Sequence, residues 1–386
     1  MIGKVQAMAK GGAGIIRESD KTIFIPGVVA GETVEYAVLG RRQSVWQGKL
    51  LRVLEASPLR VEPPCPHYHE CGGCNLQHMS YEEQLRSKSE ILLANLKKIA
   101  GLAVPGPLAI LPSRPWRYRS KSEFQVRGGV GGFFMKESHQ VVAVSQCLLL
   151  PEAVEAFFLA QRQALGAYAN AQLRVISNGR ELAARLEAPG GQGAWLSREH
   201  TVRFQAGACS YQQAPDQFIQ TNLFQLQPML GLLEEALEGM NLTTAADLFC
   251  GCGFFTLPLS ARCQSVLALE SDPRNLAGLR ANLDLNRAGN VRVIQADVLQ
   301  AELPPAGLYV VDPPRGGLSS RVITALAASG AETVIYFSCD SATFARDLRL
   351  FSGQGFSLRE LQLLDNFPQT DHFEIFSVLK KKQSLG

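Results

Sequence analysis

The sequence predicts an α/β protein in which a doubly wound parallel sheet follows a small β-barrel and a central region. Three observations lead to this fold class. Apolar runs alternate with helical segments from about residue 243 onward, glycine-punctuated runs fill the first 56 residues, and a proline-rich break follows them. A chain of 386 residues is long enough for two or three domains of roughly 100 to 200 residues each. We therefore expect domains at 1–56, 57–214 and 215–386.

The composition excludes a disordered tail or a fibre, because 46% of the residues are hydrophobic and 19% are charged. No apolar stretch approaches the roughly 18 residues of a membrane span, and no signal-peptide core follows Met1, so we expect a soluble, cytoplasmic protein. The net charge of +3 is too small to indicate a polyanionic partner by itself. Nine cysteines, odd in number and clustered, favour metal ligation or thiol chemistry over a disulfide scaffold.

The first 56 residues have the pattern of a small β-barrel. Runs at 22–27, 32–38 and 48–54 are punctuated by glycine and proline turns, which favours short strands over helices. Basic side chains gather in the second half of the segment, at Arg41, Arg42, Lys49 and Arg52. They fit a solvated barrel surface and a nucleic-acid contact equally well.

The central region combines one amphipathic helix, one basic segment and further short strands. Apolar positions predict a helix over 81–100, which Gly101 ends, and a second helix over 152–165. Between them, the segment 114–121 places cationic side chains around Trp116 and Tyr118. Aromatic rings among arginines can stack on bases while the guanidinium groups hold phosphates, so this segment is a candidate RNA contact. A solvated strand edge is the alternative.

Five continuous apolar runs in the C-terminal region alternate with helical segments. They lie at 246–249, 266–269, 291–294, 308–311 and 334–337. Continuous apolar strands separated by helices indicate a parallel sheet that is covered on both faces, a Rossmann-like arrangement. Two further runs, at 356–364 and 373–379, predict an antiparallel hairpin at the edge of this sheet.

Four cysteines form a candidate metal centre. Cys65, Cys71 and Cys74 are spaced C-x5-C-x2-C with two glycines before the last, and Cys147 is the obvious fourth ligand. Four thiolates suit a structural zinc or an iron–sulfur cluster, and nearby histidines at 67, 69 and 78 keep zinc open. A radical enzyme is less favoured, since such enzymes leave one iron open with a three-cysteine C-x3-C-x2-C loop.

Acidic residues at successive strand ends predict a cofactor pocket. The first strand leads into 249–253, where the third glycine of a dinucleotide-binding loop is missing, so a cofactor without phosphates fits better. Glu270 ends the second strand, where a carboxylate can hold both ribose hydroxyls of an adenosine. Asp297 follows the third strand, in reach of the adenine edge. Together these positions describe an S-adenosylmethionine pocket.

The fourth and fifth strands end in the candidate catalytic residues. Asp312 opens an Asp-Pro-Pro-Arg sequence, in which Arg315 replaces the aromatic residue typical of amino-group methyltransferases. Cys339 is the only cysteine at a strand end. A thiolate that adds to carbon 6 of uracil makes carbon 5 nucleophilic, and a base must afterwards remove the carbon 5 proton. Glu374, at the start of the last strand, is our candidate for that base.

Nearly the whole chain resembles the bacterial RNA uridine-5 methyltransferases that act on 23S ribosomal RNA or on the T loop of tRNA. The motifs that carry the resemblance are the cysteine segment, 218–222, 338–340 and 372–374. The resemblance implies that the barrel is a TRAM domain, an OB-like RNA-binding module. It implies four ligands of a 4Fe-4S cluster, at Cys65, Cys71, Cys74 and Cys147, with zinc less favoured.

The resemblance also assigns the remaining site residues. Contacts to S-adenosylmethionine fall on Gln220, Phe249, Glu270, Asp297 and Asp312. Cys339 becomes the nucleophile and Glu374 the base, with Asp312 orienting the uracil.

The sequence departs from the family pattern at Phe254, where many relatives have a polar residue, and at Gln369 and Asp371, which replace histidines. We expect a monomeric enzyme that makes 5-methyluridine in RNA by flipping the target base. A 23S rRNA substrate is favoured over tRNA, and the sequence does not name the uridine. The alternative from another class is a catalytically idle iron–sulfur protein that binds RNA.

Overall fold

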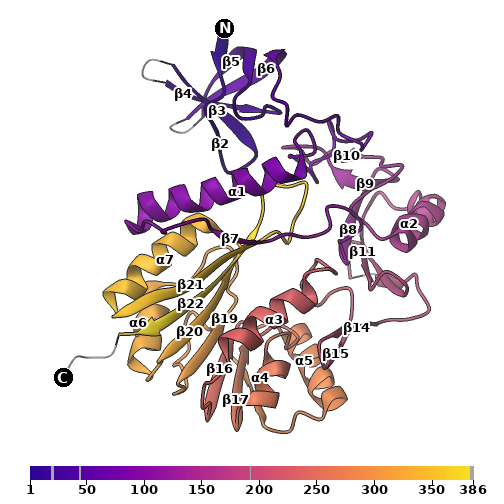
Figure 1. Ribbon diagram of the computed structural model, residues 1–386. Helices are drawn as coiled ribbons and strands as arrows, with labels where there is room; N and C mark the ends of the chain where they lie inside the picture. The colour runs from indigo at the N-terminus through magenta and orange to yellow at the C-terminus, as the bar shows by residue number, and fades with distance from the viewer. Residues whose placement is uncertain (19–20, 43–44, 192, 383–386) are drawn as a thin grey trace.

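The computed structural model describes residues 1–18, 21–42, 45–191 and 193–382. In Figure 1 a small β-sheet unit forms one end of the molecule, helix α1 (Tyr81–Asn95) lies beneath it, and the largest sheet lies below this helix. A second β-rich unit stands beside them. No helix among the described residues is both long and apolar enough to cross a bilayer.

The N-terminal unit is a six-stranded sheet wrapped around its own hydrophobic core. Its strands are β1 (Ile2–Lys4), β2 (Ala7–Met8), β3 (Ala13–Glu18), β4 (Lys21–Pro26), β5 (Thr33–Arg42) and β6 (Val45–Glu55), in the order β1-β5-β6-β4-β3-β2. Alternate residues of these strands, such as Ile23, Ile25, Val34 and Tyr36, are buried in the core. The three strands predicted from the apolar runs are confirmed, with β5 and β6 longer than expected.

The central unit is built on a second six-stranded sheet and one helix. The strands are β8 (Lys121–Arg127), β9 (Val130–Phe134), β10 (Val141–Val142), β11 (Asn170–Ser177), β12 (Leu182–Glu187) and β13 (Gly193–Trp195), in the order β10-β9-β8-β11-β12-β13. Helix α2 (Glu152–Leu165), which has the predicted bounds, packs on this sheet through the stacked rings of Phe124 and Phe158. A hairpin, β14 (Val202–Ala206) with β15 (Cys209–Gln213), leads to the last unit.

The C-terminal unit is an eight-stranded sheet in the order β18-β17-β16-β19-β20-β22-β21-β7. The strands are β16 (Thr244–Leu248), β17 (Ser265–Glu270), β18 (Val291–Gln295), β19 (Leu308–Val311), β20 (Thr333–Ser338), β21 (Phe356–Leu364), β22 (Glu374–Lys381) and β7 (Ala109–Leu111). The strands β16 to β20 are mutually parallel and match the five predicted runs.

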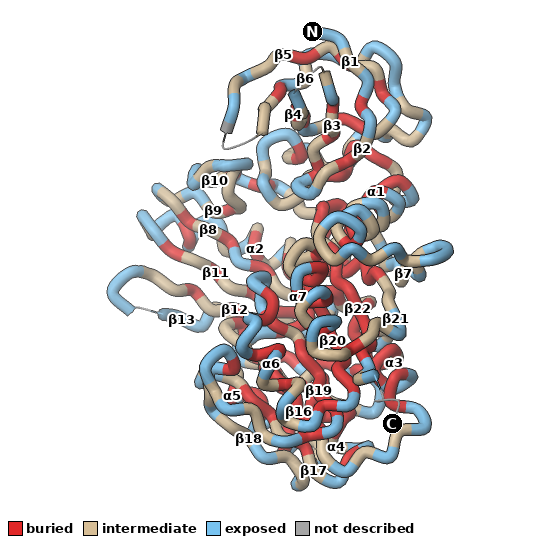
Figure 2. The backbone as a smooth tube through the Cα atoms, turned by 90° about the vertical axis from the view of Figure 1, so that its left-hand side faces the viewer, coloured by how far each residue is buried: buried red, intermediate tan, exposed pale blue. Residues whose placement is uncertain are grey.

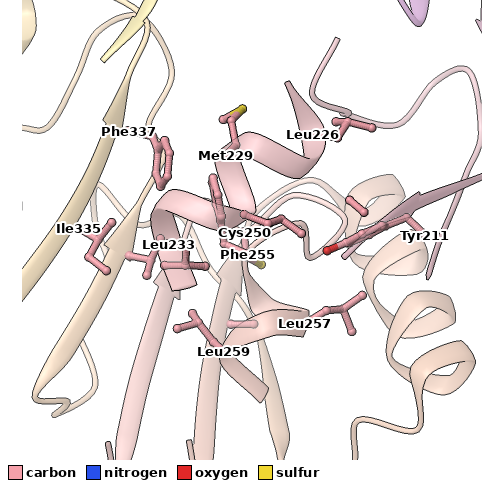
Figure 3. Close-up of a cluster of buried hydrophobic side chains, with 14 of the residues drawn as sticks. Tyr211, Leu226, Met229, Leu233, Cys250, Phe255, Leu257, Leu259, Ile335 and Phe337 are labelled. Carbon is pink, nitrogen blue, oxygen red and sulfur yellow. The ribbon is translucent and has the colours of Figure 1, made fainter. Parts of the chain in front are cut away.

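Helices cover both faces of this sheet, as the continuous apolar strands predict. Helices α3 (Leu226–Ala236), α4 (Thr256–Arg262) and α5 (Pro273–Asn286) lie on one face, and α6 (Ser320–Ala328), α7 (Ser341–Gly353) and α1 on the other. In β20, Ile335 and Phe337 enter the first core, which Figure 3 shows, while Val334 and Tyr336 enter the second. Figure 2 shows the buried residues concentrated in these central strands.

Two segments that precede the catalytic sheet in the chain belong to it in space. Strands β21 and β22 form the predicted antiparallel hairpin. Strand β7 pairs in parallel with β21, so the predicted place of this hairpin at the sheet edge is wrong. Helix α1 continues as a π-helical turn, η1 (Leu96–Ala100), ends at Gly101 as predicted, and packs against α7. Both segments lie within 57–214, the range expected for the central domain, and the domain division itself remains a prediction.

Candidate active site

The antiparallel register of β20 and β22 brings the predicted nucleophile and base together. Ser338 is paired with Ile375, so the next positions across the sheet are Cys339 and Glu374. Cys339 directly follows β20 and Glu374 begins β22. Glu374 is buried and Cys339 is half-buried. Two residues separated along the chain therefore meet at the carboxyl end of the parallel sheet, where open α/β sheets bind their ligands.

Asp312 and Gln220 join this pair from two other elements. Asp312 follows β19, the neighbour of β20, and its Oδ2 accepts a hydrogen bond of 2.9 Å from Gln220 Nε2. Gln220 is buried and lies in the segment that precedes α3. The exposed Arg315 lies three residues beyond Asp312, and its Nη2 is 3.3 Å from His372 Nε2. The structure thus gathers one thiol, two carboxyl groups, one amide and one guanidinium group.

Burial and mutual repulsion shift the pKa values of this group. Burial, then the charges of Glu374 and Asp312, raise the pKa of Cys339 to about 12. Burial also raises the pKa of Asp312 to about 7. The pKa of Glu374 is raised well above its ordinary value by burial and by Asp312, while Arg315 acts in the opposite direction. The group can therefore hold protons near neutral pH, which is the property that acid–base chemistry needs.

The loop after β16 is the candidate cofactor-binding loop, and it lies at the same edge of the sheet as Asp312, because β16 and β19 are parallel neighbours. Phe249, Gly251 and Gly253 all have left-handed backbone conformations, with φ values of 62°, 53° and 90°. A Cβ atom at Gly253 would lie 2.6 Å from Leu279 Cδ1, so glycine is required there. Gly251 N donates to Glu270 Oε2 at 3.0 Å, which joins the loop to the end of β17.

Asp247 is a site residue that sequence reasoning did not select. The Thr256 hydroxyl donates to its Oδ2 at 2.5 Å, but its buried Oδ1 has no hydrogen-bond partner among the described residues. Burial raises the pKa of Asp247 to about 7, with Asp312 and Glu270 adding to the effect. A buried acceptor without a partner favours a donor from a bound ligand. The signal in the sequence is an acidic residue near the end of an otherwise apolar strand.

Asp297 lies at the end of β18, beside Glu270, and is exposed. Ala296 N donates to Glu270 O at 3.0 Å, which keeps the two strand ends together. The Asp297 carboxylate accepts hydrogen bonds of 3.0 Å from Leu299 N and Gln300 Nε2. It therefore caps the following turn, the arrangement expected of an acidic residue at a helix start. Its contact with a cofactor stays a prediction.

The four predicted metal ligands line one small cavity of about 40 Å³. Burial raises the pKa of Cys74 to about 12, and the charges of Cys147, Cys71 and Cys65 add to this effect, as expected for neighbouring thiols. Within the described ranges, no three His, Cys, Asp or Glu side chains are grouped closely enough to hold a single metal ion.

The nearby histidines are engaged in other contacts. His67 Nε2 lies 2.8 Å from Ser145 Oγ, and the ring nitrogens of buried His78 contact Tyr68 OH at 2.6 Å and Val28 O at 2.9 Å. Four cysteines line the cavity, and His67, which also lines it, already contacts Ser145.

The basic segment 114–121 differs in part from the prediction. Tyr118 is buried and its hydroxyl donates to Pro368 O at 3.0 Å, so this ring does not stack on a base. Arg117 is bound to Glu155 at 2.9 Å. Arg119 and Lys121 line an open groove of about 1090 Å³ between the N-terminal and central units. Arg60 and Lys136 line it as well, and so do the carboxylates of Glu62, Glu123 and Glu137. Cationic side chains in a groove of this size fit a nucleic-acid backbone.

The doubly wound sheet, with acidic residues at its strand ends and no phosphate-binding glycine loop, defines the class of S-adenosylmethionine-dependent methyltransferases. Residues 194–303 and 306–382 match the family described as tRNA (Uracil-5-)-methyltransferase. The chain is 33% identical, over 97% of its length and 92% of the relative, to the 23S rRNA (uracil(1939)-C(5))-methyltransferase RlmD of Pseudomonas entomophila. It is 30% identical to an uncharacterized RNA methyltransferase of Aquifex aeolicus, with 98% of each chain covered.

The fold is also similar to that of a solved methyltransferase structure, over nearly the full length of both chains. The tRNA (uracil-54, C5)-methyltransferase of Pyrococcus abyssi, in complex with S-adenosyl-L-homocysteine, superposes with a TM-score of 0.78 and 20% identity, covering 98% of this chain and 99% of the other. The chain belongs to the family of RNA uracil-5 methyltransferases. It is an S-adenosylmethionine-dependent enzyme whose substrate is RNA.

Proposed function

We propose that this enzyme makes 5-methyluridine in 23S rRNA, with Cys339 as nucleophile and Glu374 as base. The observation that carries the mechanism is the register of β20 and β22, which places these two residues side by side. The choice of 23S rRNA is supported by the relative of 33% identity, which carries that name. The structural likeness to the tRNA enzyme, at 20% identity, supports the fold alone.

S-adenosylmethionine, when bound, supplies an electrophilic methyl group. The loop 249–253 fits its adenosine part, because the third glycine of a dinucleotide-binding loop is missing. In addition, the buried Asp247 Oδ1 has no hydrogen-bond partner among the described residues and can accept a hydrogen bond from a ligand. We assign Phe249, Glu270 and Asp297 to this part, and Gln220 and Asp312 to the end that faces Cys339.

Cys339, Glu374 and Asp312 each have one role in the proposed chemistry. The thiolate form of Cys339 adds to carbon 6 of uracil, and the electron pair of the double bond between carbons 5 and 6 moves toward carbon 5 and, by conjugation, toward the oxygen of the carbon 4 carbonyl. After carbon 5 carries the methyl group, the Glu374 carboxylate takes the carbon 5 proton. The freed electron pair restores the double bond and the carbon–sulfur bond breaks, which returns the thiolate. Gln220 fixes one oxygen of Asp312 and leaves the other to orient the uracil ring.

The target uridine has to leave its RNA stack for this chemistry. Glu374 is buried and Cys339 half-buried at the strand ends, so a base that remains stacked does not reach both. The groove lined by Arg119 and Lys121 runs between the N-terminal unit, which we assign as a TRAM-type RNA-binding domain, and the central unit. We assign this groove to the RNA backbone.

We also propose that Cys65, Cys71, Cys74 and Cys147 hold a 4Fe-4S cluster. All four thiols line one cavity, and four cysteine thiolates are the ligand set of a cluster in which each iron takes one thiolate. The chemistry above needs no electron transfer, so we assign the cluster a structural role. Anaerobically purified protein should contain equal amounts of iron and sulfide. Cys74→Ser should lose them, whereas Cys263→Ser, in the catalytic core, should keep them. Zinc in place of iron would contradict this assignment.

The test of the function uses labelled S-adenosylmethionine with transcripts of 23S rRNA and of tRNA. We expect methylation of the 23S fragment that contains the uridine equivalent to position 1939 in the relatives. Cys339→Ala should abolish it, and Cys263→Ala, which alters a buried cysteine away from the site, should not. A Cys339→Ala protein that still methylates RNA would show the assigned mechanism to be wrong, and methylation of tRNA alone would show the assigned substrate to be wrong.

A further inference from the structure

The loop that leads into Glu374 is held by residues from several other parts of the chain. We call residues 365–373, which join β21 to β22, the catalytic loop. In Figure 1 this yellow segment rises from the sheet to the level of α1. Lys88 and Gln84 of α1 bind it, Tyr118 donates to Pro368 O, and Asn222 Nδ2 donates to Asn366 O at 3.0 Å. Its conformation is therefore held from outside as well as by its own turn, in which Thr370 N and Oγ1 donate to Phe367 O.

Asn75, which follows Cys74, binds the catalytic loop at residue 371. Its Nδ2 donates to Asp371 Oδ1 at 2.7 Å, and its Oδ1 accepts from Asp371 N at 2.9 Å. These two bonds close a ring between the side chain of Asn75 and residue 371, three positions before Glu374. The same Nδ2 donates to Gly11 O at 3.0 Å, and Gly11 N donates to Asp371 Oδ2 at 2.7 Å. The N-terminal unit, the cysteine segment and the catalytic loop thus meet at one side chain.

The backbone beside Asn75 holds a strained part of the same loop. Gln369 has a left-handed conformation with φ of 70°, which is costly for a residue with a side chain. Its carbonyl accepts from Asn75 N at 3.1 Å and Leu76 N at 3.0 Å, and Gln84 binds its amide and side chain. Strain of this kind persists where the surroundings determine the conformation, and it is typical of functional sites.

Asp371 is the charged member of the contact. Burial acts to raise its pKa, but the charge of His372 and the hydrogen bonds from Asn75 and Gly11 prevail and lower it. The carboxylate is therefore ionised at neutral pH and needs donors.

We propose that Asn75 is a positioning residue for the last chemical step: through Asp371 it fixes the loop that places Glu374 against carbon 5 of the uracil. This inference rests on the proposed role of Glu374 as base. It follows that loss of the contact slows proton removal and release of the enzyme from RNA, while addition of Cys339 and methylation of carbon 5 proceed. A side chain with a merely structural role would affect all steps together.

The experiment measures two quantities in a single turnover of the full-length protein with labelled S-adenosylmethionine and a 23S fragment. One is the total methyl group on RNA, and the other is the fraction of RNA that migrates with the protein in denaturing gels. For Asn75→Ala we expect methylation at the wild-type rate and release slowed by about tenfold to a hundredfold, the effect of a misplacement near 1 Å. Asn290→Ala is the control, because it removes two side-chain hydrogen bonds, against three for Asn75→Ala, but lies far from the catalytic loop in the fold.

Exchanging the carboxylate and the amide between positions 75 and 371 tests the contact without removing either side chain, so a folding defect does not decide the outcome. Asn75→Asp places two carboxylates face to face and should slow release further. The double variant Asn75→Asp with Asp371→Asn restores a donor and an acceptor, so release should recover toward the wild-type rate. If the double variant is no faster than Asn75→Asp, the inference is wrong, whatever the single variants do.

The variant Glu374→Gln distinguishes a failure of this inference from a failure of the proposed function. This variant should accumulate the covalent complex with ordinary RNA. If it does and Asn75→Ala does not, the inference is wrong and the role of Glu374 stands. If Glu374→Gln accumulates no complex, the role of Glu374 is wrong and the inference falls with it.

Discussion

The contact between α1 and the catalytic loop contains a buried ion pair whose removal has a defined consequence. Lys88 Nζ donates to Asp365 Oδ1 at 2.6 Å and to Phe367 O at 3.1 Å, and the exposed fraction of either side chain is 1% or less. Lys88→Met fills the same space but leaves the Asp365 carboxylate without its cation. Removal of one partner of a buried pair lowers the free energy of unfolding by about 3–5 kcal/mol.

Urea unfolding followed by circular dichroism measures this loss. Lys98→Met, on the exposed face of η1, is the control and should change the free energy of unfolding by less than about 0.5 kcal/mol. Adding Asp365→Asn to Lys88→Met removes the uncompensated charge and should recover most of the loss. A loss below about 1 kcal/mol for Lys88→Met, the usual effect of an exposed ion pair, would refute the reasoning. So would a double variant that is less stable than the single one.

Two further predictions concern the site itself. Because the thiolate is the reactive form and the pKa of Cys339 is raised to about 12, its alkylation by iodoacetamide, followed by peptide mass spectrometry, should rise about tenfold per pH unit through the neutral range. Above pH 7, where Asp312 is ionised, Asp312→Asn removes a negative neighbour and should speed this alkylation; a slower reaction would contradict the assigned charge interaction. Gly251→Ala forces alanine into a left-handed conformation and places its Cβ 3.3 Å from Phe218, so calorimetry should show about tenfold weaker binding of S-adenosylmethionine. Gly289→Ala meets no atom within 4 Å and should bind normally, and equal affinities of the two variants would place the cofactor elsewhere.

The parallel strands could be predicted because each one carries its own signal. A strand such as Leu308–Val311 is buried on both faces, and a continuous apolar run records that burial locally. Strand β7 carries no such signal. Its three residues show no usable period, and their place at the sheet edge depends on pairing with β21, more than 250 residues along the chain.

The candidate site shows the same division between local and distant information. Strand-end positions singled out Cys339 and Glu374 one by one, but their adjacency depends on the register of two strands, which neither segment encodes alone. The basic residues around Tyr118 predict that its ring contacts RNA, but its hydroxyl donates to the carbonyl of Pro368 in the interior. Asn75 had no signal at all, since its partner Asp371 is 296 residues away.

The central claim is that Cys339 and Glu374 act on the same uracil ring. The most direct test incubates the protein with S-adenosylmethionine and a 23S fragment that carries 5-fluorouridine at the target position. Glu374 can remove a proton from carbon 5 but cannot remove fluorine, so the carbon–sulfur bond persists. Mass spectrometry should find the methylated, fluorinated pyrimidine attached through carbon 6 to Cys339. Attachment to another cysteine, or no adduct from protein that methylates ordinary RNA, would contradict the account.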